Sequence, residues 1–201
     1  MTAIGDFCVV IRQWLAVGED VYPDPLVTSW VRMSEEWMSE NLRVKHMIQI
    51  DWQDIIEWRV LLPPDWQELD TVRFREGGKP LIYAPRDEYY VPNYDLKGRY
   101  TIVGNYLLVG KVDETAGTEI EISYYQSIPP LEDEPNWVMK YYSRLYTVCA
   151  LWHASMYAIE DSRKDMWQDQ TFTFVNDMNR GHILSKASGS LLHSRRRASF
   201  G

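Results

Sequence analysis

The sequence predicts an α+β fold, with a helical bundle core, an inserted small antiparallel β-sheet part and an extended C-terminal arm. Apolar residues recur every three or four positions towards both ends of the chain, as on amphipathic helices. Between these regions the period falls to two, and turns rich in glycine and proline separate short apolar runs. We therefore expect N-terminal helices over residues 1–59, a β-rich insertion over 60–130, C-terminal helices completing the core over 131–184, and a basic arm over 185–201.

Two helices are expected before the insertion. The first covers residues 4–16 and stops at Gly18. The second begins with Asp24 as its N-cap and Pro25 at the first helical position, and it ends near Arg43. The acidic residues placed on the outer face of this second helix are Glu35, Glu36 and Glu40.

Five short strands are expected in the insertion. They cover residues 71–74, 80–83, 100–103, 106–109 and 120–125. Gly77-Gly78 and Gly104-Asn105 are the expected turns of two hairpins. Pro63-Pro64 forbids a helix just before them, so residues 65–69 form at most one helical turn.

The helical period returns after Asp133. One helix is expected over residues 137–159, an interruption at Asp161-Ser162, and a last helix over 165–178 that ends at Gly181. We expect these two helices to pack with the helix over 25–42, since three apolar stripes have no other surface to bury them.

Charge changes sign at the end of the chain. The whole chain carries a net charge of −8, but its last 21 residues contain no acid and contribute +4 from Lys186, Arg195, Arg196 and Arg197. The first 180 residues therefore carry the balance of −12. An acidic body with a basic, serine- and glycine-rich arm is typical of an arm that becomes ordered on another molecule.

Composition favours an assembling protein. The chain has 9 Trp and 13 Tyr but only 5 Phe, and Trp and Tyr suit subunit interfaces as well as cores. Cys8 and Cys149 lie among apolar residues and are expected to be buried thiols. No apolar run reaches the ~18 residues of a membrane span, and no signal peptide begins the chain. We expect a soluble product, made in the host cytoplasm, with no membrane partner.

No signature of catalysis or of metal binding is present. Cys149 and His153 have the spacing of a pair on one helix, but they lack a third partner and lie on an apolar helix, so buried packing is the expected role. Neither a phosphate-binding glycine loop nor a nucleophile elbow occurs. We expect no catalytic, cofactor-binding or metal site.

The basic arm has three interpretations. Three adjacent arginines could contact nucleic-acid phosphates, although the acidic body would repel a duplex. The arm also contains apolar anchors, which fit a groove on a protein better than a purely electrostatic contact. A merely disordered terminus is the third interpretation. The candidate binding residues are Leu191, Leu192, Arg195, Arg196, Arg197 and Phe200.

The order of several motifs resembles the head-to-tail adaptor proteins of short-tailed bacteriophages, also called tail accessory or head completion proteins. The resemblance spans roughly residues 20–201. It rests on Leu-Leu-Pro-Pro-Asp-Trp at 61–66, Gly-Arg-Tyr-Thr-Ile-Val-Gly at 98–104, the strand and Pro-Pro-Leu of 120–131, the helix opened by Asn136-Trp137, the segment 161–167, and the tail 188–195.

This resemblance implies a virion protein without enzymatic activity. Such proteins form a ring, usually of twelve copies, below the portal protein at the head–tail interface, and DNA passes through the ring during genome ejection without specific binding. The C-terminal arm would bind the portal through the six residues named above, and the ring would bind a further tail protein, a nozzle or a tail fibre. The alternatives are a nucleic-acid-binding module that uses the basic arm, or a small tail-associated hydrolase.

Overall fold

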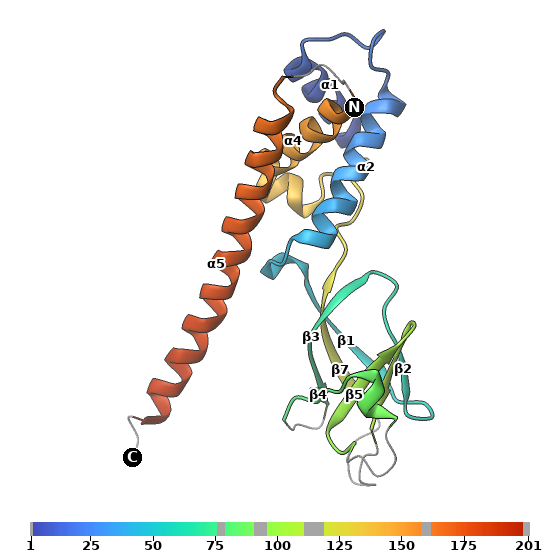
Figure 1. The fold of residues 1–201 in the computed structure, drawn as a ribbon, viewed down its shortest axis with the longest axis vertical. Coiled ribbons are helices and arrows are strands. Elements are labelled where there is room, and N and C mark those ends of the chain that lie inside the picture. The colour runs from blue at the N-terminus through green and yellow to red at the C-terminus, as the bar shows by residue number, and fades with distance from the viewer. Residues whose placement is uncertain (1, 76–78, 91–95, 111–118, 158–161, 199–201) are drawn as a thin grey trace. The chain divides into compact units, whose positions relative to one another are not determined.

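The computed structural model describes residues 2–75, 79–90, 96–110, 119–157 and 162–198, with 187–198 as backbone only (Figure 1). The chain divides into two compact units. We call Met1–His46 with Ile128–Gly201 the helical unit, and Met47–Ser127 the strand unit. The α+β prediction is confirmed. None of the described helices combines the length and apolar character that a membrane span needs.

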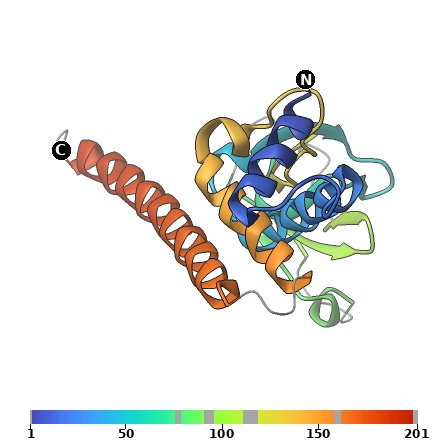
Figure 2. The ribbon, with the colours of Figure 1, turned by 90° about the horizontal axis from the view of Figure 1, so that it is seen from above.

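The helical unit contains four long helices. α1, α2 and α4 lie together, and α5 packs on α4 before it leads away from the other helices (Figure 1; Figure 2). Their bounds are Ala3–Leu15 for α1, Asp24–Asn41 for α2, Trp137–Tyr157 for α4 and Lys164–Ala198 for α5, and a 3-10 turn covers Lys45–Met47.

The beginnings of the first two helices differ in how they are capped. The hydroxyl of Thr2 accepts a hydrogen bond from the Gly5 N–H and caps α1. The N-cap of α2 is Pro23 and not Asp24 as predicted, because Asp24 is already the first helical residue. Its carboxylate instead accepts a hydrogen bond from Arg12 of α1 at 2.5 Å, so the acid ties two helices together rather than capping its own.

α4 is bent near its start. Tyr142 has non-helical dihedral angles, φ −138° and ψ 38°, inside the segment predicted as an uninterrupted helix. Its hydroxyl lies 3.3 Å from Nδ1 of His46, whose ring stacks on Trp137 and Tyr141. Beyond the bend, every residue from Leu145 to Ser155 is buried except the partly buried Thr147, and the last two residues of α4 are exposed. The predicted end of this helix at Ile159 and the interruption at Asp161 lie outside the described residues.

The strand unit is built from two sheets. One sheet has the strand order β1-β7-β3, in antiparallel pairs, and the other has the order β2-β6-β5-β4, with β4 parallel to β5. A short helix, α3, covers Arg86–Tyr89. The strands are β1 Ile48–Asp54, β2 Arg59–Leu61, β3 Trp66–Phe74, β4 Ile82–Tyr83, β5 Arg99–Val103, β6 Tyr106–Val109 and β7 Glu119–Gln126.

Some of the predicted sheet is confirmed and some is wrong. The hairpin of β5 and β6 forms as predicted, with Gly104 at φ +59° in its turn. The predicted hairpin of 71–74 with 80–83 is wrong, because β3 pairs with β7 and β4 pairs with β5. Residues 66–69 are strand rather than a helical turn. β1 was missed, so the strand unit begins near residue 47 and not at 60.

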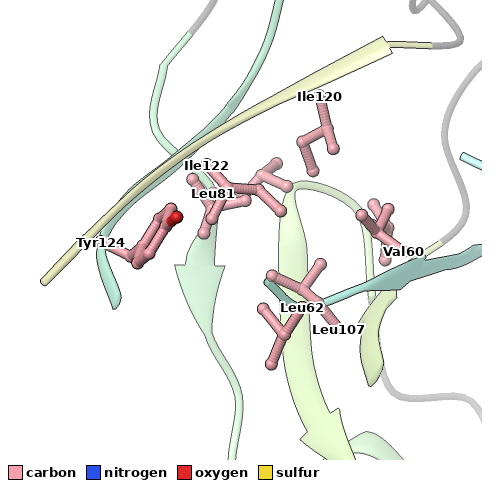
Figure 3. Packing of buried hydrophobic residues seen from close by; sticks show 9 residues of the cluster. Val60, Leu62, Leu81, Leu107, Ile120, Ile122 and Tyr124 are labelled. Carbon is pink, nitrogen blue, oxygen red and sulfur yellow. The ribbon is translucent and has the colours of Figure 1, made fainter. Parts of the chain in front are cut away.

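One apolar core lies between the facing sides of the two sheets. Alternate residues of β7 point into this core, towards side chains of the other sheet and of the segment before β4 (Figure 3). Its buried members are Val60, Leu62, Val72, Leu81, Leu107, Val109, Ile120, Ile122 and Tyr124.

The last helix is longer than predicted. Gly181 was expected to end it, since glycine favours helix ends, but α5 continues to Ala198. Gly181 does not adopt a positive φ here, and a glycine inside a helix costs only about 1 kcal/mol relative to alanine. The arm over residues 185–198 is therefore helical rather than an extended chain.

Candidate interaction surface on the last helix

The first half of α5, residues 164–179, is packed against the other helices. Trp167, Thr171 and Val175 are buried at helical spacing. Nearby, the Phe172 ring contacts the rings of Trp37 from α2 and Trp152 from α4, with ring centroids 5.3 and 5.7 Å away. Tertiary packing therefore positions this proximal half.

Asn179 ends the packed half of the helix. Its Oδ1 accepts a hydrogen bond from the Arg43 N–H at 2.7 Å, and its Nδ2 donates to the Asn41 carbonyl oxygen at 2.8 Å. Both backbone groups lie at the end of α2, where the helix leaves carbonyl groups without an intrahelical partner. One side chain thus caps α2 and fixes the direction in which α5 leaves it.

The second half of α5, residues 180–198, presents an apolar pair to solvent. Ile183 is 65% exposed and Leu184 is 59% exposed. Isolated exposed apolar side chains are common, but two adjacent ones on a helix form a candidate surface for another molecule. A small hollow of about 250 Å³ lies at the root of this distal half, lined by Val44, Lys45, Tyr142, Met178, Gly181, His182 and Ser185.

The predicted binding residues lie on this distal half or beyond it. The backbone of residues 191–197 is helical, and the side chains of Leu191, Leu192, Arg195, Arg196 and Arg197 lie outside the described residues, as does all of Phe200. Ile183 and Leu184 were missed. An adjacent apolar pair between Arg180 and Lys186, just past the expected helix end, is the signal that could have revealed them.

Cys149 and His153, the predicted buried pair of α4, are both buried. Burial raises the pKa of the Cys149 thiol to about 12 and lowers the pKa of the His153 imidazole to about 4. Both groups are therefore neutral at pH 7, and the imidazole rests on the Trp152 ring at 4.9 Å. Within the described residues, no three His, Cys, Asp or Glu side chains are arranged to hold a metal ion.

A buried carboxylate joins α2 to the segment before α4. Glu35, predicted on the outer face, is only 4% exposed. It accepts hydrogen bonds from the Leu131 N–H at 2.6 Å and from the hydroxyl of Tyr146, and it pairs with Arg32 at 2.9 Å. Burial and the adjacent carboxylate raise the pKa of Tyr146 well above its usual range, so its hydroxyl stays a donor.

A comparison with known families identifies the family of this chain. The family described as SU10 adaptor protein matches residues 2–194 of the 201. The chain belongs to the SU10 adaptor protein family. No curated protein matches this chain. Membership confirms the resemblance to phage adaptor proteins and implies a component of the virion that interacts with other phage structural proteins.

The extent of the SU10 adaptor match also corrects the sequence analysis. The resemblance was placed on residues 20–201, but the match begins at residue 2 and so includes α1. The structure agrees, because the N–H groups of Ala3 and Ile4 donate to the carbonyl oxygens of Asp133 and Glu132, and α1 is part of the helical core. The match ends before Arg195.

Proposed function

We propose that the protein assembles into a ring of twelve subunits that joins the portal to the tail at the head–tail interface, and that the distal half of α5 binds the portal. Membership in the SU10 adaptor protein family supports a role as a phage adaptor. The observation that carries the proposal further is the exposed apolar pair, Ile183 and Leu184, on a helix that has already left its own bundle.

A preformed helix is a better docking element than an extended arm. Its apolar residues can enter a groove between neighbouring portal subunits, in the manner of other helix-in-groove contacts. Because its backbone is already ordered, binding avoids much of the ~1–2 kcal/mol per residue that ordering a free chain requires. Arg195, Arg196 and Arg197 lie at its end, where bidentate pairs with portal carboxylates would set the register.

The rest of the subunit would form the channel and the tail-facing surface. The first 180 residues carry a net charge of −12. A channel lined by acidic residues would let DNA pass, because it lacks the basic groups that contact phosphates. The face of the ring away from the portal would bind the next tail component, a nozzle or a tail fibre.

Portal binding by α5 is tested with truncated and substituted full-length protein. Truncation after Gly189 should leave the helical unit folded and abolish stable docking, measured by co-sedimentation with purified portal. Ile183→Glu with Leu184→Glu should weaken docking at least ~100-fold, since two buried apolar anchors are lost. Val21→Glu, at an apolar residue that is 54% exposed away from α5, is the matched control and should dock normally.

Other outcomes of this experiment would replace the proposal. Undiminished docking of both the truncated protein and the Ile183→Glu, Leu184→Glu variant would show that the distal half does not bind the portal. DNA binding that falls steeply with salt and disappears on truncation would identify the arm as a nucleic-acid contact. The mass of the complex with portal gives the copy number, and a value other than twelve would correct the number of subunits in the proposed ring.

A further inference from the structure

The turn between β1 and β2 has an unfavourable backbone for its residues. Ile56 and Arg59 exchange two hydrogen bonds, N–H to carbonyl oxygen, at 3.0 and 2.9 Å. Between them Glu57 has φ +50° and Trp58 has φ +65°. Two-residue hairpin turns with positive φ at both central positions normally contain Asn-Gly or Asp-Gly, because bulky side chains are strained there. The chain thus maintains strain in this segment, which we call the 56–59 turn.

The 56–59 turn presents its bulky residues to solvent. Ile56 is 72% exposed and Trp58 is 50% exposed, and the acid Glu57 lies between them in the connection from β1 to β2, an edge strand of its sheet. Strained backbone persists mainly where function requires it, and an exposed tryptophan is the residue most often found as an anchor in interfaces. These features indicate an apolar anchor with one negative charge.

The helical unit contains an open cavity of complementary character. Its volume is about 490 Å³, within the ~300–1,000 Å³ typical of pockets that hold small ligands, and large enough for an indole ring. It lies among α1, α4 and α5 and is lined by Trp14, Ser143, Arg144, Thr147, Val148, Leu151, Met166, Trp167 and Gln170. We call it the α4–α5 cavity.

One charged residue that lines the α4–α5 cavity is suited to an incoming acid. The Arg144 guanidinium lies at the cavity and 5.0 Å from the Phe174 ring centroid, on a side chain that remains exposed. A cavity with apolar walls and a cation complements an apolar turn that carries a carboxylate.

We propose that the 56–59 turn of one copy inserts into the α4–α5 cavity of a neighbouring copy. Trp58 and Ile56 would fill the apolar space, and Glu57 would pair with Arg144. Because turn and cavity are different surfaces of the same chain, the contact is heterologous, and such contacts generate closed rings or open filaments. This inference rests on the ring of the proposed function and names the residues that join its subunits.

Cross-linking of cysteine variants tests the direction of this contact. A short bismaleimide is the suitable reagent, since the Cα atoms of an Arg–Glu pair lie farther apart than a disulfide permits. Full-length protein with Glu57→Cys and Arg144→Cys should give a ladder of oligomers. A mixture of the two single variants should give dimers only, and each single variant alone should give none.

Two controls define the background of this experiment. The unsubstituted protein should not cross-link, because Cys8 and Cys149 are buried. Asp87→Cys with Arg144→Cys, which moves the first cysteine to an exposed site on α3, should give no ladder. Dimers from Glu57→Cys alone would indicate turn-to-turn pairing, and absence of the ladder in the double variant would overturn the proposal.

Substitutions at the contact provide a second, independent test. Trp58→Gly removes the anchor but suits the positive φ, so it should weaken self-association at least ~30-fold in sedimentation without lowering the subunit's melting temperature. Glu57→Arg should weaken it as well, and combining it with Arg144→Glu should restore it. Undiminished association of Trp58→Gly would refute the contact.

The same variants separate this proposal from the proposed function. Glu57, Trp58 and Arg144 lie outside the distal half of α5, so their effect on single-subunit docking to portal reports on a different surface. If the double variant gives no ladder of cross-linked oligomers but truncation still abolishes portal docking, only the contact between copies is refuted. If the ladder is intact but the truncated protein and the Ile183→Glu, Leu184→Glu variant both dock undiminished, only portal binding by α5 is refuted.

Discussion

The two halves of α5 share one helical backbone but have different surroundings. The proximal half, residues 164–179, buries Trp167, Thr171 and Val175 against its own subunit, whereas the distal half exposes Ile183 and Leu184. Asn179 lies at the boundary and binds the end of α2. Apolar residues on a helix therefore serve two purposes in one element. Before Asn179 they stabilise the fold, and after it they are available to a partner.

The largest expected effect is on the free energy of unfolding, and it distinguishes a buried side chain from an exposed one. Trp152→Ala should lower the free energy of unfolding by ~3–5 kcal/mol, because Trp152 is 7% exposed and contacts Trp37 and Phe172 under the proximal half. Leu184→Ala on the distal half should change it by less than ~0.5 kcal/mol. Chemical denaturation measures both. Equal losses would show that the distal half is packed on its own subunit.

Acid should weaken the core beneath the proximal half. Burial holds the pKa of His153 at about 4, below the 6.5 of an unburied imidazole, so unfolding takes up a proton between these pH values. Stability from this group is complete above about pH 6.5 and falls, by up to ~3 kcal/mol, as the pH decreases to about 4. In the His153→Leu variant, the denaturation midpoint should depend less on pH over this interval. An unchanged slope would contradict the assignment.

Removing the boundary contact should have an intermediate effect. Asn179→Ala loses two hydrogen bonds to the end of α2 and should cost ~1–2 kcal/mol. Hydrogen exchange should also become faster at the Arg43 amide, which donates to Asn179. Asp177→Ala, at an exposed position of the same helix, is the control. Comparable effects of the two variants would mean that Asn179 has no special role at the boundary.

The smallest expected effect has the opposite sign. A Cβ added to Gly181 would meet no atom within 4 Å, so Gly181→Ala should stabilise the protein by ~0.4–1 kcal/mol and increase its helicity by circular dichroism. Gly104→Ala is the contrasting variant, because Gly104 has φ +59° and the substitution should destabilise the β5–β6 turn. A destabilised Gly181→Ala protein would place the end of α5 at this glycine, as the sequence alone suggested.

Residues that act within one element were predicted well, and those that act between distant segments were not. The Pro25 helix start, the β5–β6 hairpin with Gly104 and the apolar spacing of α4 are local signals, and the structure has all three elements. β1 was missed although Ile48, Ile50 and Trp52 alternate, because its pairing partner β7 begins 65 residues after its own end. β3 also pairs with β7, which begins 45 residues after β3 ends, and for this reason β3 was predicted as half of a hairpin with β4.

The C-terminal segment that we propose for binding was predicted as an extended arm, whereas its backbone is helical over residues 185–198. Composition identified the last residues as basic and unlike the body, which needs no structure. Their helical backbone could not be inferred past Gly181, since glycine at a helix end and glycine within a helix differ by only about 1 kcal/mol. The strained 56–59 turn could not be predicted from the sequence either, because Glu57 and Trp58 have no local preference for positive φ.

The sequence by itself determined the class of the fold, the helices with strong apolar periods, the change of charge at the C-terminus and the resemblance to phage adaptors. Those properties depend on neighbouring residues and on their order. Only the tertiary structure decided that Glu35 is buried, because its partners Leu131 and Tyr146 lie more than 90 residues away. Only the tertiary structure decided where α5 leaves the bundle. Asn179 forms hydrogen bonds with Asn41 and Arg43, which are more than 130 residues away in the sequence.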